Sequence, residues 1–492
     1  MIEINPSRWK TSPWVHQTRG TRLLMQHPRF ALFWKMRLGK SKAAIDAFCE
    51  LADAGEVDTL LLLAPKQVVN VWTDKEVGEM KAHCWKEVVS IQYENSDYDL
   101  YVPDRPVLAF VAASLEFLRQ EGPNPKVPFP LASELMRALE GRKVMMVLDE
   151  GSAIGKWDSG NTRASTFIAE KVDRAVLLDG TPFGNSPLTL YSKFKFLDKD
   201  ILGCDNFFHF RGRYSVKGGF RGKQVVGYRN LDKLMKLTEP HCEYLEREPK
   251  GMPEKVYGFL PVAMPEDVWK VYKQMRDEYV AEWEGSMATV PNGAVRSMRL
   301  AQIASGFLGG FQDESTGISE TRKLSEHVAD AFKAWLETRL EEDRDFKCVV
   351  WSRWRAEIEL VVAKISGITK LNRVGQCWGD RKDPNFLHPS WHGLKGSAVM
   401  VCQPQAVAYG VNMSKASAEI YLSSNYDRVL REQSEDRPID SQRSRTVSVT
   451  DVVVTGPQGQ KTAFHDIVAS VKSKGELEKR SAQVWRKILS EE

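Results

Sequence analysis

The stretch KVMMVLDE, residues 143–150, is an unbroken apolar run that ends in two carboxylic acids. Three similar runs lie in the same half of the chain: TLLLLAP (59–65), VLAFVAAS (107–114) and RAVLLDG (174–180). Stretches with apolar residues at helical spacing lie between these runs or before them, such as SKAAIDAFCELADAG (41–55). Strands that are apolar on both faces and alternate with helices indicate a parallel sheet covered on both sides. The first half of the chain therefore predicts an α/β fold.

Farther along the chain the pattern changes twice. Long helical stretches are expected from about residue 262 to residue 340, including 264–283 and 321–345. Strand signals then return in FKCVVWS (346–352), SAVMVCQ (397–403), AEIYLSS (418–424) and TVSVTDVVV (446–454). The pattern predicts two α/β lobes with parallel sheets and a mainly helical insertion between them.

Composition excludes several classes of protein. Hydrophobic residues make up 42% and charged residues 27% of the 492 residues, so the chain is not disordered, collagen-like or a coiled coil. There is no long apolar run and no apolar segment at the N-terminus, so we expect neither a membrane span nor an export signal. The seven cysteines include no CxxC pair, which predicts a reducing compartment and no structural zinc. Because 69 Lys and Arg face 65 Asp and Glu, a nucleic-acid partner would have to bind a local basic surface.

The first candidate for chemistry is FWKMRLGKS, residues 33–41. It places Gly39, Lys40 and Ser41 at the start of a helical stretch. Amides at a helix N-terminus and a lysine can hold the phosphates of a nucleotide, while the neighbouring hydroxyl ligates magnesium. The first glycine of the GxxxxGK[ST] pattern is missing, because position 34 is Trp. A plain helix start that carries a lysine is therefore an equal alternative for this stretch alone.

The acidic pair Asp149 and Glu150 follows a strand, at the place where ligands bind in open α/β sheets. Asp149 would hold magnesium, and Glu150 would polarise the water that attacks the γ-phosphate. A solvated acidic pair is the alternative. A Gly-Lys-Ser and a strand-terminal Asp-Glu in this order within one lobe favour a nucleotide site.

The stretch LLDGTPFGNSPLTLYSKFKFLD, residues 177–198, is very similar to the third motif of one helicase branch. This is the Swi/Snf-like branch of the superfamily-two helicase ATPases, whose members translocate on double-stranded DNA. A Gly-Thr-Pro turn followed by an amphipathic helix explains the composition of the stretch, but not the ordered match. The chain resembles the compact bacterial or bacteriophage members of this branch.

Other segments resemble the motifs of the family in the family's order. In PWVHQTRG (13–20), Gln17 would read the adenine; in LLLAPKQVVNVW (61–72), Lys66 would contact a nucleic-acid backbone. The segment AVAYGVNMSKAS (406–417) places Gly410 in a nucleotide-binding motif, and REQSEDRPIDSQRSR (431–445) resembles the last motif.

Three positions depart from the family pattern. Arg37 replaces a glycine of the phosphate loop, and Ser152 stands where the family often has His. In the last motif Asp440 occupies the place of an arginine that stabilises the transition state, a contribution of roughly 1,000-fold in related enzymes. Arg437 and Arg443 are the two candidates to replace it.

The segment RGRYSVKGGFRGKQVVGYR, residues 211–229, contains no acidic residue. Its Gly-Gly and paired valines predict a hairpin with a basic edge, suited to a phosphate backbone. A solvated hairpin kept apart from other chains by its charge is an equal alternative. The candidate nucleic-acid contacts are Arg211, Arg213, Lys217, Arg221 and Lys223.

The resemblance implies two RecA-like lobes. Residues 1–240 would form the N-terminal ATP-binding lobe, with a basic segment at 204–230; residues 241–345 would form a linker and helical insertion; and residues 346–492 would form the C-terminal lobe. It also implies ATP and Mg²⁺ as cofactors, duplex or branched DNA as the partner, and the cytoplasm of a bacterium or infected host cell as the location.

The function implied is that of an ATP-dependent DNA translocase or helicase that remodels DNA or displaces bound proteins. An RNA helicase with the same ATP chemistry is one alternative. A catalytically degenerate nucleic-acid-binding module is another, motivated by Arg37, Ser152 and Asp440.

Overall fold

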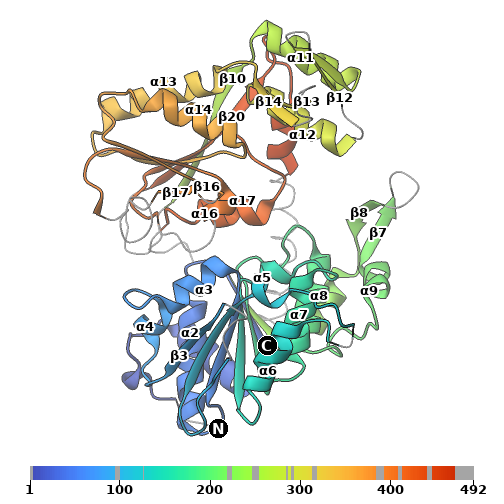
Figure 1. Ribbon diagram of the computed structural model, residues 1–492, viewed down its shortest axis with the longest axis vertical. Helices are drawn as coiled ribbons and strands as arrows, with labels where there is room; N and C mark the ends of the chain where they lie inside the picture. The colour runs from blue at the N-terminus through green and yellow to red at the C-terminus, as the bar shows by residue number, and fades with distance from the viewer. Residues whose placement is uncertain are drawn as a thin grey trace. The chain divides into compact units, whose positions relative to one another are not determined.

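The computed structural model describes residues 4–94, 100–125, 127–218, 224–246, 254–283, 286–289, 293–312, 319–379, 381–383, 393–407, 413–439 and 446–470. By their contacts, the described residues up to 246 form one unit and those from 254 to 470 form a second. Figure 1 draws the first unit in blue to green and the second in yellow-green to red. Within this described part of the chain, no helix combines the length and the apolar character needed to cross a lipid bilayer.

The first unit is built on a parallel sheet. Its seven strands lie in the order β3-β4-β2-β5-β6-β1-β9, and every neighbouring pair is parallel. The strands are β1 (Arg29–Trp34), β2 (Thr59–Ala64), β3 (Val89–Tyr93), β4 (Ala109–Ser114), β5 (Val144–Asp149), β6 (Arg174–Leu178) and β9 (Cys242–Leu245). Every residue of β2, β4 and β5 is buried, which explains why these runs are apolar on both faces. The four strands predicted in this half are confirmed.

Helices connect these strands, because parallel neighbours cannot be joined by tight turns. The helices are α1 (Val15–Gln26), α2 (Lys40–Asp53), α3 (Lys66–Thr73), α4 (Glu79–His83), α5 (Leu115–Leu118), α6 (Pro130–Ala138), α7 (Gly160–Ala169), α8 (Leu190–Leu197), α9 (Phe207–Tyr214) and α10 (Leu231–Thr238). Figure 1 shows α2 and α7 on opposite sides of the sheet. The sheet is thus covered on both faces, as its apolar strands require.

The register of three adjacent strands determines which residues meet at one edge. Asp149 at the end of β5 pairs with Leu178 at the end of β6, and Leu178 pairs with Leu32 of β1. The chain segments that follow β1, β5 and β6 therefore leave the sheet side by side. These segments carry the Gly-Lys-Ser, the Asp-Glu and the Gly-Thr-Pro sequences.

The second unit repeats the architecture. Its strands lie in the order β10-β20-β19-β15-β18-β16-β17, and all pairs are parallel except β16 with β17. They are β10 (Lys255–Ala263), β15 (Lys347–Trp351), β16 (Arg373–Trp378), β17 (Arg381–Lys382), β18 (Ala398–Cys402), β19 (Ala418–Tyr421) and β20 (Val447–Thr455). Its helices include α13 (His327–Glu342), α14 (Arg355–Ile365), α16 (Pro404–Val407) and α17 (Arg428–Glu435). The predicted fold of two α/β lobes is confirmed.

The segment between the two lobes is less helical than predicted. It contains α11 (Glu266–Asp277) and α12 (Gly293–Ala304), but also the antiparallel pairs β11 (Val280–Trp283) with β12 (Ser286–Thr289) and β13 (Phe307–Gln312) with β14 (Ser319–Lys323). The expected helix 264–283 was wrong beyond Asp277, where Tyr279 adopts a left-handed φ of 62° and the β-forming residues of β11 follow. The expected helix 321–345 begins only at His327. Two strands within the predicted insertion 241–345 belong to the lobes instead, because β9 joins the first sheet and β10 joins the second.

Three tryptophans are core residues. Trp34, Trp72 and Trp351 are at most 1% exposed. Each indole N–H donates at 2.8 Å to a buried carboxylate: Trp34 to Glu243, Trp72 to Asp149 and Trp351 to Glu419. Burial of an indole leaves its N–H in need of an acceptor, and these pairs supply it.

The second unit also buries a carboxylate whose hydrogen-bond partners are neutral serine hydroxyls. Glu357 of α14 is 1% exposed and accepts hydrogen bonds from the hydroxyls of Ser352 and Ser423. Burial raises the pKa of Glu357 from 4.5 to about 7. The unfolded chain therefore ionises this group first, and the free energy of unfolding falls as the pH rises from about 4.5 to about 7.

We expect Glu357→Gln to remove this pH dependence, because the amide keeps the shape and accepts the same hydroxyl hydrogen bonds without a charge. The wild type should lose on the order of 3 kcal/mol of unfolding free energy through this group between pH 5 and pH 9, and the variant should not show this loss. Urea unfolding at the two pH values measures the difference. Equal pH profiles for variant and wild type would show that Glu357 does not titrate in this window.

Candidate functional site

The phosphate-loop candidate lies between β1 and α2. Gly39 has a left-handed φ of 73° and directly precedes α2, which begins at Lys40 as expected. The left-handed φ favours glycine at this position, and a Cβ there would also displace Nε2 of Gln17. The predicted helix start with Lys40 and Ser41 in its first turn is confirmed.

Lys40 lies close to the third motif. Its Nζ donates to the carbonyl oxygen of Trp34 at 2.8 Å, and it lies 3.7 Å from the point where a Cβ on Gly180 would stand. Burial raises the pKa of Asp149 and the Lys40 charge opposes that rise, so the two groups lie within electrostatic reach of each other. Three predicted motifs therefore converge at one edge of the first sheet.

Asp149 is held in a fixed position. It is 8% exposed, its Oδ2 accepts from the indole N–H of Trp72 at 2.8 Å, and its Oδ1 accepts from the backbone N–H of Glu150 at 2.9 Å. Burial raises the pKa of Asp149, and Lys40 opposes that rise. Glu150 is half-buried and adopts a left-handed φ of 59°, an uncommon conformation for a residue with a side chain.

Sequence reasoning missed a buried ion pair under the third motif. Nζ of Lys193 in α8 lies 2.5 Å from Oδ2 of Asp179, and both side chains are fully buried. Lys193 also donates to the carbonyl oxygen of Pro182 at 2.7 Å, while Asp179 Oδ1 accepts from the N–H of Thr181 at 2.8 Å. The Gly-Thr-Pro turn is thus held from both sides. The available signal was an acid at the end of an apolar strand and a lysine inside the helix that follows the Gly-Thr-Pro turn.

Sequence reasoning also missed Glu79, at the start of α4. Burial raises its pKa from 4.5 to about 7, and the neighbouring Asp149 adds to that rise. Arg37 opposes it, so the arginine that departs from the family pattern lies near these carboxylates. Arg37 keeps the left-handed backbone expected of a glycine, with a φ of 67°. No spacing rule connects residue 79 with the phosphate loop, and only the fold places it there.

Comparison with known proteins assigns the chain to a family. The SNF2-related domain family matches residues 30–305, which is more than half of the chain. The chain belongs to the SNF2-related family. The predicted membership in the Swi/Snf-like branch of the superfamily-two ATPases is confirmed.

The chain spans about half or less of the length of two curated relatives that it matches. An uncharacterised ATP-dependent helicase of Mycoplasma genitalium is 24% identical over 316 residues, 63% of this chain and 28% of the relative. A protein named p41 of Acyrthosiphon pisum secondary endosymbiont phage 1 is 24% identical over 245 residues, 47% of this chain and 51% of the relative.

Two solved structures of a Sulfolobus solfataricus SWI2/SNF2 ATPase core are also similar, one in complex with dsDNA and one of the core domain. They are 15% and 14% identical, each with a TM-score of 0.41. The matches cover 92% of this chain and 90% and 87% of those chains. At this level of similarity they carry no part of the assignment.

Gln17 of the SNF2-related chain connects α1 to the phosphate loop. It is 5% exposed, its Oε1 accepts from the N–H of Trp14 at 2.9 Å, and its Nε2 donates to the carbonyl oxygen of Leu38 at 3.2 Å. One amide hydrogen and one lone pair remain for another partner. Its reading of adenine stays a prediction.

The donor set at this edge suits Mg²⁺ held together with a nucleotide. Ser41 offers a hydroxyl in the first turn of α2 and Asp149 offers a carboxylate. Among the residues that the structure describes, no three His, Cys, Asp or Glu side chains gather into a metal cage. Mg²⁺ is ordinarily bound by one or two carboxylates together with substrate phosphates, so a site of this kind fits the residues present.

The basic segment was assigned in part to the wrong element. Arg211 and Arg213 lie on α9 rather than on a hairpin, because Asn206 caps a helix there by accepting from two backbone N–H groups. The hairpin follows as β7 (Ser215–Gly218) paired with β8 (Gln224–Tyr228), and Lys217 lies on it, as predicted. Arg221 and Lys223 lie outside the described residues. Lys66 is exposed at the start of α3.

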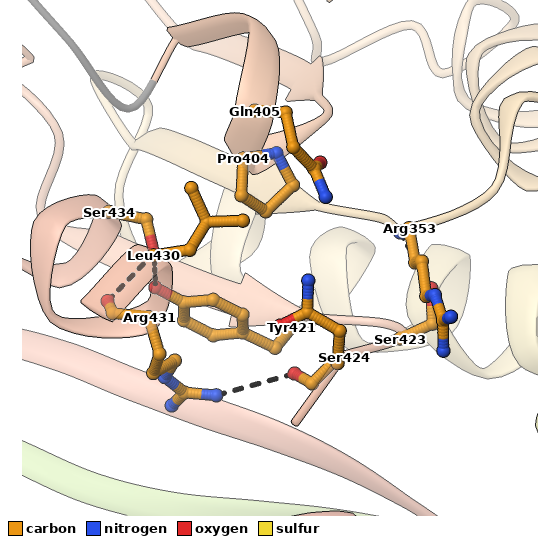
Figure 2. Close-up of a pocket in the computed structure, with 10 residues that line it drawn as sticks. Arg353, Pro404, Gln405, Tyr421, Ser423, Ser424, Leu430, Arg431 and Ser434 are labelled. Atoms are coloured by element: carbon orange, nitrogen blue, oxygen red, sulfur yellow. Dashed lines mark hydrogen bonds between the residues drawn. The ribbon is translucent and has the colours of Figure 1, made fainter. Parts of the chain in front are cut away.

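In the second unit the last motif begins in α17, which a buried arginine attaches to the sheet. Arg431 lies 3.4 Å above the ring of Tyr421 and makes ion pairs at 2.5 Å with Glu435 and with Asp451. Figure 2 shows Arg431 and Tyr421 side by side in a small pocket with Arg353, Gln405 and Ser434.

Arg437 follows α17, is half-buried, and its carbonyl oxygen accepts from the N–H of Met413 at 3.2 Å. Gly410, Asp440 and Arg443 lie outside the described residues, so their predicted roles stay predictions. The same holds for the role of Arg437.

The buried pair Asp179–Lys193 predicts a non-additive pair of substitutions. Lys193→Met leaves a buried carboxylate without its cation and should lower the unfolding free energy by about 3–5 kcal/mol. Adding Asp179→Asn keeps the acceptor for Thr181 and should recover most of that loss. Urea unfolding of the full chain measures both, with Lys199→Met at an exposed position just after α8 as the control. Additive losses in the double variant would contradict the pairing.

Proposed function

We propose that the chain is an ATP-dependent DNA translocase or helicase that acts on duplex or branched DNA, remodelling it or displacing bound proteins. One observation carries the proposal: three adjacent parallel strands bring the phosphate loop, the Asp-Glu pair and the third motif to one edge of the first sheet. The name of the Mycoplasma relative, an ATP-dependent helicase, agrees with this reading.

The residues at this edge divide the chemistry between them. Bound Mg²⁺ and ATP supply the electrophilic γ-phosphate and part of the charge neutralisation. Lys40 and the amides at the start of α2 would hold phosphate oxygens, while Ser41 and Asp149 would hold the metal. Glu150 orients the attacking water and accepts its proton. Gln17 would read the adenine of the nucleotide.

The proposed binding to DNA is electrostatic. Lys66, Arg211, Arg213 and Lys217 are cations of the first unit that suit phosphate contacts, and Arg221 and Lys223 extend the same basic sequence. Contacts to phosphates carry no base information, so binding is largely independent of sequence and weakens with salt.

We expect Glu150→Gln to lower the kcat of ATP hydrolysis by about 100-fold or more, because the amide cannot accept a proton. Lys40→Ala should lower kcat/KM by about 100-fold or more through loss of phosphate charge neutralisation. Lys143→Ala is the control, since Lys143 precedes the opposite end of β5 and donates to the carbonyl of Gly55. Phosphate release measures all three. No release by wild type with DNA and Mg²⁺ would favour the degenerate binding module instead.

We expect duplex DNA to stimulate hydrolysis by wild type more than single-stranded DNA or RNA at equal nucleotide concentration. We expect duplex DNA to be the strongest activator because the third motif resembles that of the Swi/Snf-like branch, for which duplex DNA is the predicted partner. A titration of ATPase rate against the three polymers measures it. Stronger stimulation by RNA would establish the RNA-helicase alternative.

We expect one of Arg437→Ala and Arg443→Ala to lower kcat by roughly 1,000-fold, because a transition-state arginine contributes about that much in phosphoryl transfer. The other variant should stay within a few-fold of wild type. Single-turnover hydrolysis separates the loss from any change in nucleotide binding. Wild-type rates for both variants would exclude both arginines from this role.

A further inference from the structure

One face of the first unit combines uncompensated positive charge with exposed aromatic rings. Residues 206–231 contain no Asp or Glu. Four of its Lys and Arg residues lie in the described part of the chain, and no ion pair there engages Arg211, Arg213, Lys217 or Arg229. Figure 1 shows α9 and the β7–β8 hairpin together on the green side of the unit. We call these two elements the basic face.

An aromatic cluster borders the basic face. Trp157, in the loop before α7, stacks on Phe207 of α9 with ring centroids 5.2 Å apart and an interplanar angle of 13°. Phe208 meets the edge of Trp157 at 5.6 Å. Phe208 is 64% exposed and Trp157 is 37% exposed. The two exposed rings lie next to each other, and adjacent exposed apolar surface rimmed by polar residues marks a candidate interaction site.

The aromatic cluster and the basic face are joined to the third motif. Tyr191 of α8 is 4% exposed and lies edge-on to Phe207 at 5.5 Å. The hydroxyl of Tyr228 at the end of β8 donates to Oγ of Ser186 at 2.9 Å. Helix α8 also carries Lys193, whose buried ion pair holds the Gly-Thr-Pro turn. A ligand on this face therefore contacts elements that are directly packed on the nucleotide-site motifs.

We propose that the aromatic cluster stacks an unpaired base at a junction between duplex and single strand, while Arg213 and Lys217 hold the flanking phosphates. This rests on the proposed function and adds to it a preference for branched over continuous duplex DNA. Stacking on aromatic side chains is open to any base, because every base has a π face, and it commonly accompanies a positively charged groove.

The positive charge of the basic face and the exposed rings of the aromatic cluster together favour an unpaired nucleotide as the ligand. A continuous duplex keeps its bases stacked on one another and offers a protein its phosphates and groove edges, so it needs no exposed rings. An apolar protein partner would leave the acid-free segment 206–231 unneutralised. An unpaired nucleotide satisfies both features, since its phosphates are anionic and its base face is free.

The test uses forked DNA carrying 2-aminopurine in the unpaired arm next to the junction, with the full-length chain. Phe208→Leu removes the π face and keeps an apolar side chain, and Phe208→Ala removes both. Each should weaken binding to the fork about tenfold and abolish the change in 2-aminopurine fluorescence. Affinity for relaxed closed circular duplex, measured by competition, and the ATPase stimulated by that duplex should stay at wild-type values.

Tyr101→Ala is the matched control, because Tyr101 is 71% exposed on the same unit and lies outside the aromatic cluster. Thermal melting of each variant checks folding. Wild-type fork affinity and fluorescence in Phe208→Leu would overturn the stacking site, even where duplex DNA still stimulates hydrolysis. A change of oligomeric state in Phe208→Leu without any change in fork binding would instead make this face a protein interface. Failure of wild type to bind any DNA would overturn the proposed function as well.

Discussion

The parallel register of β1, β5 and β6 is the constraint on which the candidate site depends. Because Leu178 pairs with both Asp149 and Leu32, three segments far apart in sequence leave the sheet next to one another. A shift of one residue would turn every side chain to the opposite face and separate these segments. Close packing on both faces resists such a shift, because the buried side chains of these strands interdigitate with their neighbours in the core.

Buried polar pairs hold the strands and the segments that follow them. The indole of Trp72 fixes Asp149, the indole of Trp34 binds Glu243 on β9, and Lys193 neutralises Asp179 under the Gly-Thr-Pro turn. Each pair satisfies a group that would otherwise be costly to bury. The site thereby keeps a fixed geometry around a phosphate loop whose Gly39 and Arg37 both adopt left-handed conformations.

Family membership and site geometry are independent lines of support. The family match spans residues 30–305 and therefore covers the phosphate loop, the acidic pair and the third motif, but not the last motif. Helices and strands of the second unit extend the same architecture beyond that match, and α17 is attached there by Arg431. The relatives' partial coverage keeps the biological substrate a matter of proposal.

The amino-acid sequence alone determined the two α/β lobes, the strands that carry the motifs, the helix start at Lys40 and the family, because apolar runs and ordered motifs are local patterns. Only the tertiary structure decided that Glu79 lies near Asp149 and Arg37, and that Lys193 pairs with Asp179. It also decided that Arg211 and Arg213 belong to a helix, and that the stretch after Asp277 turns into a strand. Such pairings join residues distant along the chain, and such ends depend on caps and packing, so no single stretch of sequence contains them.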